Sequence, residues 1–105
     1  MAEIEINVLY SLEQEIRTSD TKTKKLFEKQ KTFMGANPHH PSLGRTKLVN
    51  VCDKYGNHLW EVRLDGKRRI VFVERGTSTI IWLKICSHDE IRRNSVIRVK
   101  DDYEN

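Results

Sequence analysis

The fold is decided by residues 59–87, which read LWEVRLDGKRRIVFVERGTSTIIWLKICS. Three runs rich in β-branched and aromatic residues occupy 59–64, 68–74 and 79–87, and only short turn-like segments separate them. Connections too short to hold a helix join antiparallel neighbours, so the stretch predicts an antiparallel meander. The third run is apolar at nearly every position, which is typical of a central strand buried on both faces.

The register of the first hairpin follows from where its charges can lie. A two-residue turn at Asp65 and Gly66 would place Arg69 among apolar side chains. A three-residue loop of residues 64–66, with Gly66 in the left-handed conformation, avoids this burial. The core face then holds Trp60, Val62, Ile70 and Phe72, and the opposite face holds Glu61, Arg63, Lys67 and Arg69. Any odd loop length gives the same two faces.

Upstream of the meander the pattern predicts one strand and two helices. Apolar and polar residues alternate over residues 3–8, which indicates a half-buried strand. Ser11 and Gln14 have capping-box spacing at the start of a short helix, and Asp20 can cap a second helix that runs to about Met34. A further strand is expected near 46–52. We therefore predict an α+β fold, a small antiparallel sheet with an N-terminal helical pair packed on one face, forming a single domain over residues 1–105.

Composition narrows the functional class. The chain has 105 residues, 37% hydrophobic and 32% charged, and this length excludes a multidomain enzyme. Its apolar runs are far shorter than the roughly 20 residues that a membrane-spanning helix needs. Its first residues lack the pattern of a secretory signal. Cys52 and Cys86 form neither a disulfide framework nor a metal spacing. We expect a soluble cytoplasmic protein without metal, small-molecule cofactor or membrane partner.

Charge is distributed unevenly along the chain. The first twenty residues hold five of the 15 acidic residues, and residues 101–105 hold three more. Residues 21–100 hold 18 of the 19 basic residues. A basic body with acidic ends indicates a polyanionic partner, most commonly nucleic acid.

The hairpin face with Glu61, Arg63, Lys67 and Arg69 suits a phosphodiester. Arginine binds phosphate oxygens with two parallel hydrogen bonds, and lysine adds a point charge. Lys84 and His88 would complete a set for metal-free RNA cleavage by the substrate's own 2′-hydroxyl, provided that they point to the same side. Because both faces of their strand are apolar, the pattern leaves that facing open. A solvated, salt-bridged surface is the alternative interpretation.

The order of elements resembles the RelE/ParE toxin superfamily of bacterial toxin–antitoxin systems. The resemblance lies in residues 37–41, Leu48, residues 60–64, residues 69–72 and residues 83–90, and covers most of residues 4–91. The resemblance implies a small antiparallel sheet packed by an N-terminal helical pair, as predicted above. It also implies that RelE-like members use this sheet surface to cleave mRNA in the ribosomal decoding site. ParE-like members instead poison DNA gyrase and do not cleave RNA.

Carried over by position, the resemblance assigns roles to single residues. Arg63 and Arg69 match phosphate-binding cations, His88 matches a proton-transferring histidine, and Glu61 matches more weakly. The residues further expected to bind RNA or phosphate are Lys67, Lys84, Arg68, Arg92 and Arg93. Many members carry a tyrosine shortly after the histidine, where this chain has Ile91 followed by two arginines.

The resulting hypothesis is a toxin that cleaves mRNA on the ribosome and so inhibits translation, with a cognate antitoxin, the ribosome and mRNA as partners. A ParE-like gyrase inhibitor and an inactive antitoxin-binding member are the alternatives.

Four further residues each have two interpretations. His39 and His40 are either exposed loop residues or an RNA or ribosome contact. Trp60 and Trp82 are either core anchors or stacking platforms for bases.

Overall fold

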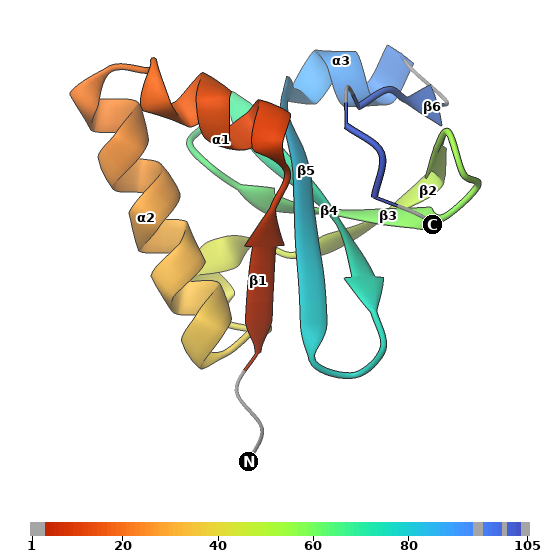
Figure 1. Cartoon of the computed structure of the whole chain (residues 1–105), viewed down its shortest axis with the longest axis horizontal. Helices are drawn as coiled ribbons and strands as arrows, with labels where there is room; N and C mark the ends of the chain where they lie inside the picture. The colour runs from red at the N-terminus through yellow and green to blue at the C-terminus, as the bar shows by residue number, and fades with distance from the viewer. Residues whose placement is uncertain (1–3, 94–95, 100, 104–105) are drawn as a thin grey trace.

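A mixed six-stranded sheet with helices on both faces forms the protein (Figure 1). The structure, a computed structural model, describes residues 4–93, 96–99 and 101–103, and leaves undescribed the side chains of Arg92, Arg93 and Val96. The elements are β1 (Glu5–Val8), α1 (Tyr10–Arg17), α2 (Thr21–Ala36), the 3-10 turn η1 (Pro41–Leu43), β2 (Thr46–Asp53), β3 (His58–Arg63), β4 (Arg68–Arg75), β5 (Thr79–Ser87), α3 (His88–Arg93) and β6 (Val96–Ile97). The α+β class and the N-terminal helical pair are as predicted.

The strand order is β1-β5-β4-β3-β2-β6. Strands β2 to β5 form the predicted antiparallel meander. The sheet departs from the predicted antiparallel arrangement at its two edges, where β1 pairs with β5 and β6 pairs with β2 in parallel. The helical pair between β1 and β2 is long enough to cross a whole face, so β1 can run beside β5 in the same direction. Because of this pairing, β5, the most apolar strand, lies between two neighbouring strands, β1 and β4.

The two N-terminal helices begin differently. Asp20 caps α2 as predicted, because its carboxylate accepts a hydrogen bond of 2.7 Å from the Thr23 backbone N–H. The predicted capping box of α1 was wrong: the N-cap is Leu9, without a side-chain hydrogen bond. The N–H of Ser11 instead donates to the carboxylate of Asp101 over 2.5 Å. A residue 90 positions away thus takes the capping role.

One core lies between the helical pair and the sheet. Trp82 at its centre is fully buried, and its ring meets that of Phe27 edge-on at 5.1 Å between centroids. The indole N–H donates to the Met34 sulfur at 3.1 Å. Burying an indole with its N–H satisfied anchors α2 to β5.

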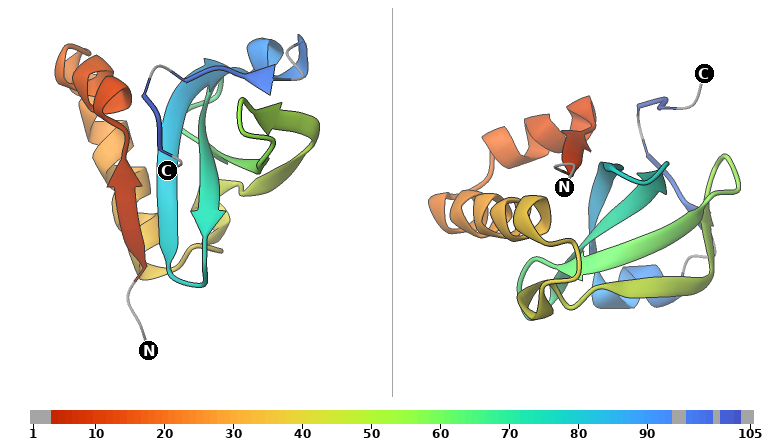
Figure 2. Two further views of the ribbon diagram at one scale, coloured as in Figure 1. Left: turned by 45° about the vertical axis from the view of Figure 1, so that its right-hand side comes forward. Right: turned by 90° about the horizontal axis from the view of Figure 1, so that it is seen from below.

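A second core lies on the opposite face, beneath α3 and the C-terminal segment (Figure 2). Leu59, Val71 and Leu83 of the sheet pack there with Ile91 of α3 and Ile97 of β6. This covering was not predicted from the sequence, and it leaves only part of the polar face open. In the described part of the chain, no helix combines the length and apolarity needed to span a membrane.

Candidate functional site

The β3–β4 hairpin has the predicted parity. Trp60 lies opposite Phe72, and Arg63 lies opposite Arg69, so the aromatic residues share the first core and the arginines share the other face. The prediction for Gly66 was wrong, because this glycine does not adopt a positive φ. The Asp65 carboxylate instead closes the loop by accepting the backbone N–H groups of residues 67 and 68, at 2.9 and 2.7 Å.

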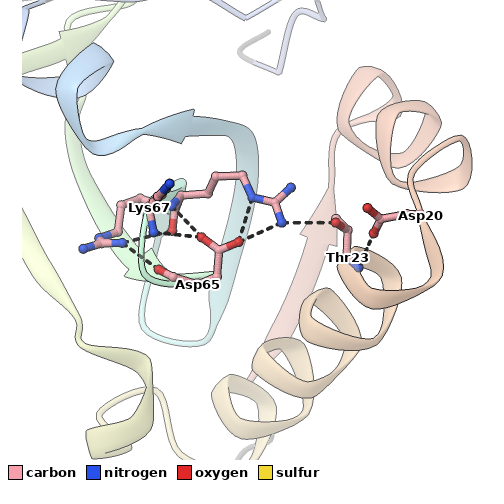
Figure 3. A network of polar contacts seen from close by, with 6 residues as sticks. Asp20, Thr23, Asp65 and Lys67 are labelled. Atoms are coloured by element: carbon pink, nitrogen blue, oxygen red, sulfur yellow. Dashed lines mark hydrogen bonds and ion pairs between the residues drawn. The ribbon is translucent and has the colours of Figure 1, made fainter.

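Arg68 connects this loop to the helical pair (Figure 3). Its Nε and Nη2 lie 2.9 and 2.8 Å from Asp65 Oδ2, and Nη2 also donates to Thr23 Oγ1 at 3.1 Å. Partial burial alone would raise the pKa of the Asp65 carboxyl. The hydrogen bonds from the Arg68 side chain and from the backbone N–H groups of residues 68 and 67 outweigh burial and lower this pKa to about 2. Arg68 therefore sits in a structural link toward α2, away from the other cations.

Arg63 and Arg69 form a pair of like charges directly across two strands. Arg69 Nη1 donates to the backbone carbonyls of residues 65 and 68, at 2.8 and 3.1 Å. The Arg63 guanidinium lies over Gly44, where an added Cβ would be 3.7 Å from Nη2. In the described part of the chain, neither arginine has a carboxylate within ion-pair distance. Like charges placed opposite one another destabilise a sheet, so this pair is not explained by stability.

A buried amide fixes the end of β3 that carries Arg63. Gln30 of α2 is 5% exposed, and its Nε2 donates to the Arg63 carbonyl at 2.5 Å and to the Ser42 carbonyl at 3.2 Å. One side chain thus holds the η1 turn and the β3 end together. Helical spacing places Gln30 on the same face of α2 as Phe27 and Met34, but it does not predict which carbonyl groups the amide would hold.

His88 lies beside the hairpin loop. It is the first residue of α3, and its backbone N–H donates to the Lys67 carbonyl at 3.1 Å. Its side chain is half-buried, and Nδ1 is buried without a hydrogen-bond partner among the described atoms. The Ser87 hydroxyl accepts from the Glu90 N–H at 3.0 Å and fixes the start of α3. The backbone register therefore places His88 on the same face as Lys67, Arg63 and Arg69. These four residues are hereafter called the cation cluster.

Glu61 and Lys84 lie on the same face of the sheet as Arg63 and Arg69, but they are not part of the cation cluster. Both lie level with Val71, on the strands to either side of it. A bulge in β5 at Leu83 sets the facing of Lys84 that the sequence left open. Glu61 is only 8% exposed, and its Oε2 has no hydrogen-bond partner in the described part of the molecule. Lys84 Nζ lies 3.6 Å from the Glu90 carboxylate and lines a separate cavity against α1.

The predicted site residues are thus only partly brought together. The cation cluster contains four of them, Glu61 lies beneath the surface, and Lys84 and Arg68 are engaged elsewhere. The predicted Arg92 and Arg93 have side chains outside the described residues. Cys86 lies opposite Arg69, and its burial raises the pKa of its thiol to about 11. Among the described residues, no group of three or more His, Cys, Asp or Glu side chains is placed to hold a metal ion.

Comparison with known proteins identifies the fold. No family model and no curated protein sequence matches this chain. Among solved structures, the archaeal RelE–RelB complex from Pyrococcus horikoshii OT3 contains a chain that is similar with a TM-score of 0.64 and 15% identity, over 82% of this chain and 96% of that chain. A copper-bound mutant toxin from Helicobacter pylori is similar with a TM-score of 0.51 and 17% identity, over 83% and 97% of the two chains. The protein has the RelE-like fold that the sequence predicted.

Proposed function

We propose that this protein is the toxin of a toxin–antitoxin pair and that it cleaves mRNA on the ribosome without a metal ion. Two observations support the toxin role: the RelE-like fold, and the description of both similar structures as toxins or as a RelE–RelB complex. The expected partner is an antitoxin that binds the toxin and blocks its basic face. Ribosome and mRNA are the further expected partners, in the cytoplasm.

The observation that carries the nuclease proposal is the cation cluster itself. Arg63 and Arg69 lie opposite one another without carboxylate partners among the described residues, and His88 adjoins them through Lys67. Such an arrangement costs stability but suits an anion with several oxygens, because two guanidinium groups can bind one phosphate from two sides.

The proposed reaction is attack of the RNA 2′-hydroxyl on the adjacent phosphorus. The O2′–P bond forms and the P–O5′ bond breaks, which leaves a 2′,3′-cyclic phosphate and a free 5′-hydroxyl. One proton leaves O2′ and one is delivered to O5′. An imidazole can accept or donate a proton near neutral pH, so we assign one of these transfers to His88. Arg63, Arg69 and Lys67 stabilise the charge that develops on the phosphoryl oxygens.

Glu61 receives a supporting role in this scheme. At 8% exposure its carboxylate does not lie on the surface that a phosphate would approach. It is two residues from Arg63 on the same face of β3, at a separation of about 7 Å along the strand. We therefore assign Glu61 a supporting position beside Arg63 and not a direct contact with the phosphate.

One observation favours the alternatives, a gyrase inhibitor or an antitoxin-binding protein without activity. The position after Glu90 holds Ile91, which is 4% exposed and packs in the second core. Many members of the family that the sequence resembles carry a tyrosine near this point. A buried isoleucine does not replace a phenolic hydroxyl.

The test is to induce the chain without an antitoxin and to map RNA 5′ ends across translated messages. We expect cuts within reading frames that disappear when translation is blocked. His88→Ala and Arg69→Ala should abolish the cuts, whereas His58→Ala should not, because His58 is an exposed histidine at the other end of β3. Growth arrest with intact messages and damaged DNA would instead indicate gyrase as the target. Absence of arrest would indicate the inactive member.

A further inference from the structure

A second pocket adjoins the cation cluster at the η1 turn. It has a volume of about 380 Å³, within the range of about 300–1,000 Å³ that is usual for ligand sites. It is lined by His39, His40, Pro41, Gly44, Arg45 and Trp60. Two histidines, a tryptophan and an arginine therefore line one shallow, open pocket.

The loop that forms one wall of the pocket is held in place. His40 Nδ1 accepts the Ser42 N–H at 3.1 Å, and the imidazole stacks on the Phe33 ring at 4.3 Å between centroids. Gly44 has a φ of 59°, a left-handed conformation that ends the turn and is easiest for glycine. His39, by contrast, presents an exposed side chain.

Arg45 forms the polar wall. Its side chain is 8% exposed, and Nη2 lies 2.8 Å from the Glu74 carboxylate. The guanidinium carbon lies 4.4 Å from the centroid of the Trp60 ring and 5.2 Å from that of Phe72. Nε and Nη1 are buried without hydrogen-bond partners in the described structure. Buried polar groups are nearly always hydrogen-bonded, so the described residues leave this guanidinium incompletely satisfied.

The pocket and the cation cluster lie on opposite faces of β3, since Trp60 packs against the first core and Arg63 is on the other side, and Gly44 lies between them. This glycine lines the pocket and also lies beneath the Arg63 guanidinium, 3.7 Å from the position of an added Cβ. A strand with one phosphate on Arg63 and Arg69 would reach the pocket with its neighbouring nucleotide by passing around Gly44, just before the start of β2.

We propose that this pocket binds one nucleotide of a single-stranded RNA whose next phosphate lies on the cation cluster. Its aromatic and imidazole rings supply stacking surfaces for a base, and Arg45 supplies donors for a base carbonyl or a phosphate oxygen. An acidic peptide would use the guanidinium but not the rings, so the composition favours RNA. The proposal rests on the proposed function in taking RNA as the ligand.

The experiment uses a 2′-O-methyl RNA heptamer, which cannot be cleaved by 2′-hydroxyl attack, so binding is measured separately from catalysis. Trp82 is fully buried and Trp60 is partly buried, so quenching of tryptophan emission by the RNA reports on the pocket. Trp60→Phe should remove this quenching. The affinity should fall about fivefold or more in His39→Ala and in Arg45→Gln. The matched control His58→Ala, outside the pocket, should bind within about twofold of the unmodified protein.

The possible results distinguish a failure of the pocket proposal from a failure of the nuclease proposal. Equal affinity in all variants, or no quenching, would overturn the pocket proposal. If Arg45→Gln fails to fold, His39→Ala decides the matter, because the exposed His39 side chain can be truncated without disturbing the core. Equal or tighter pocket-dependent binding of a hexaglutamate peptide would assign the site to an acidic protein segment instead. Pocket-dependent RNA binding by a protein that cuts no messages would retain the pocket and refute the nuclease.

Discussion

Replacing Arg63 by glutamine should make the protein more stable and less active. Arg63 faces Arg69 across β3 and β4 without a carboxylate partner in the described part of the chain. Its backbone position is held by Gln30 through the carbonyl, which the substitution leaves in place. Arg63→Gln therefore removes one of two repelling charges while it keeps a polar, though shorter, side chain.

The size of the effect follows from the geometry. Opposite residues of an antiparallel pair have Cβ atoms about 5 Å apart, and the diverging guanidinium groups are farther apart, at roughly 6–9 Å. At the solvent-exposed edge, screened Coulomb repulsion over that distance is about 0.2–0.5 kcal/mol near physiological salt. We expect the free energy of unfolding to rise by this amount. The rate of RNA cleavage should fall about 100-fold, the usual cost of losing one donor to a developing oxyanion.

Urea unfolding at low salt and at about 1 M salt measures the first effect, and message cleavage measures the second. The gain in stability should vanish at high salt, where the Debye length is about 3 Å, while the loss of activity persists. Arg69→Gln is the matched comparison: it also removes a charge, but it loses two hydrogen bonds to backbone carbonyls and should be destabilised by about 1 kcal/mol. Lower stability with full activity in Arg63→Gln would refute the reasoning.

Three further predictions concern groups around the site. The folded-state pKa of Asp65 is lowered to about 2 from 3.8, so its contribution to stability is present above about pH 4 and is lost as pH falls toward 2; Asp65→Asn should flatten the acid-unfolding curve in this window. Asp101→Ala should lower the free energy of unfolding by about 1 kcal/mol, measured by urea denaturation, because it removes the acceptor of the Ser11 N–H. At pH 8 a thiol reagent should modify the half-exposed Cys52 quickly and Cys86 slowly, because burial raises the pKa of the Cys86 thiol to about 11; fast labelling of both would contradict the buried position.

The two faces of the hairpin could be predicted from the sequence because its pattern of apolar and charged residues allows only one parity of the strand register. Trp60 and Val62 alternate with charged residues, and a register that buried Arg69 would cost several kcal/mol. Both faces of the hairpin follow from that exclusion. The facing of Lys84 could not be predicted, because its strand is apolar on both sides and the bulge at Leu83 changes the alternation.

The errors share a cause. The capping of α1 by Asp101 and the closure of the hairpin loop by the Asp65 carboxylate both depend on side-chain acceptors. Capping-box and turn rules assign these roles to nearby residues of preferred type, here Ser11 and Gly66. For α1 the acceptor comes from elsewhere in the fold and leaves no trace in the local pattern. For the loop the acceptor is the neighbouring Asp65, whose carboxylate closes the turn without a left-handed glycine.

The position of α3 explains why the cation cluster lies at the hairpin end. Ile91 and Ile97 cover the apolar half of the second face, over Leu59 and Leu83. A helix there keeps water from the apolar side chains, but it also keeps a large ligand such as RNA from most of that face. The open part is where β3 ends and β4 and α3 begin. Cations placed there can reach a phosphate without breaking the second core, and Arg63 is exposed at this end of β3 whereas Glu61, two residues earlier, is buried.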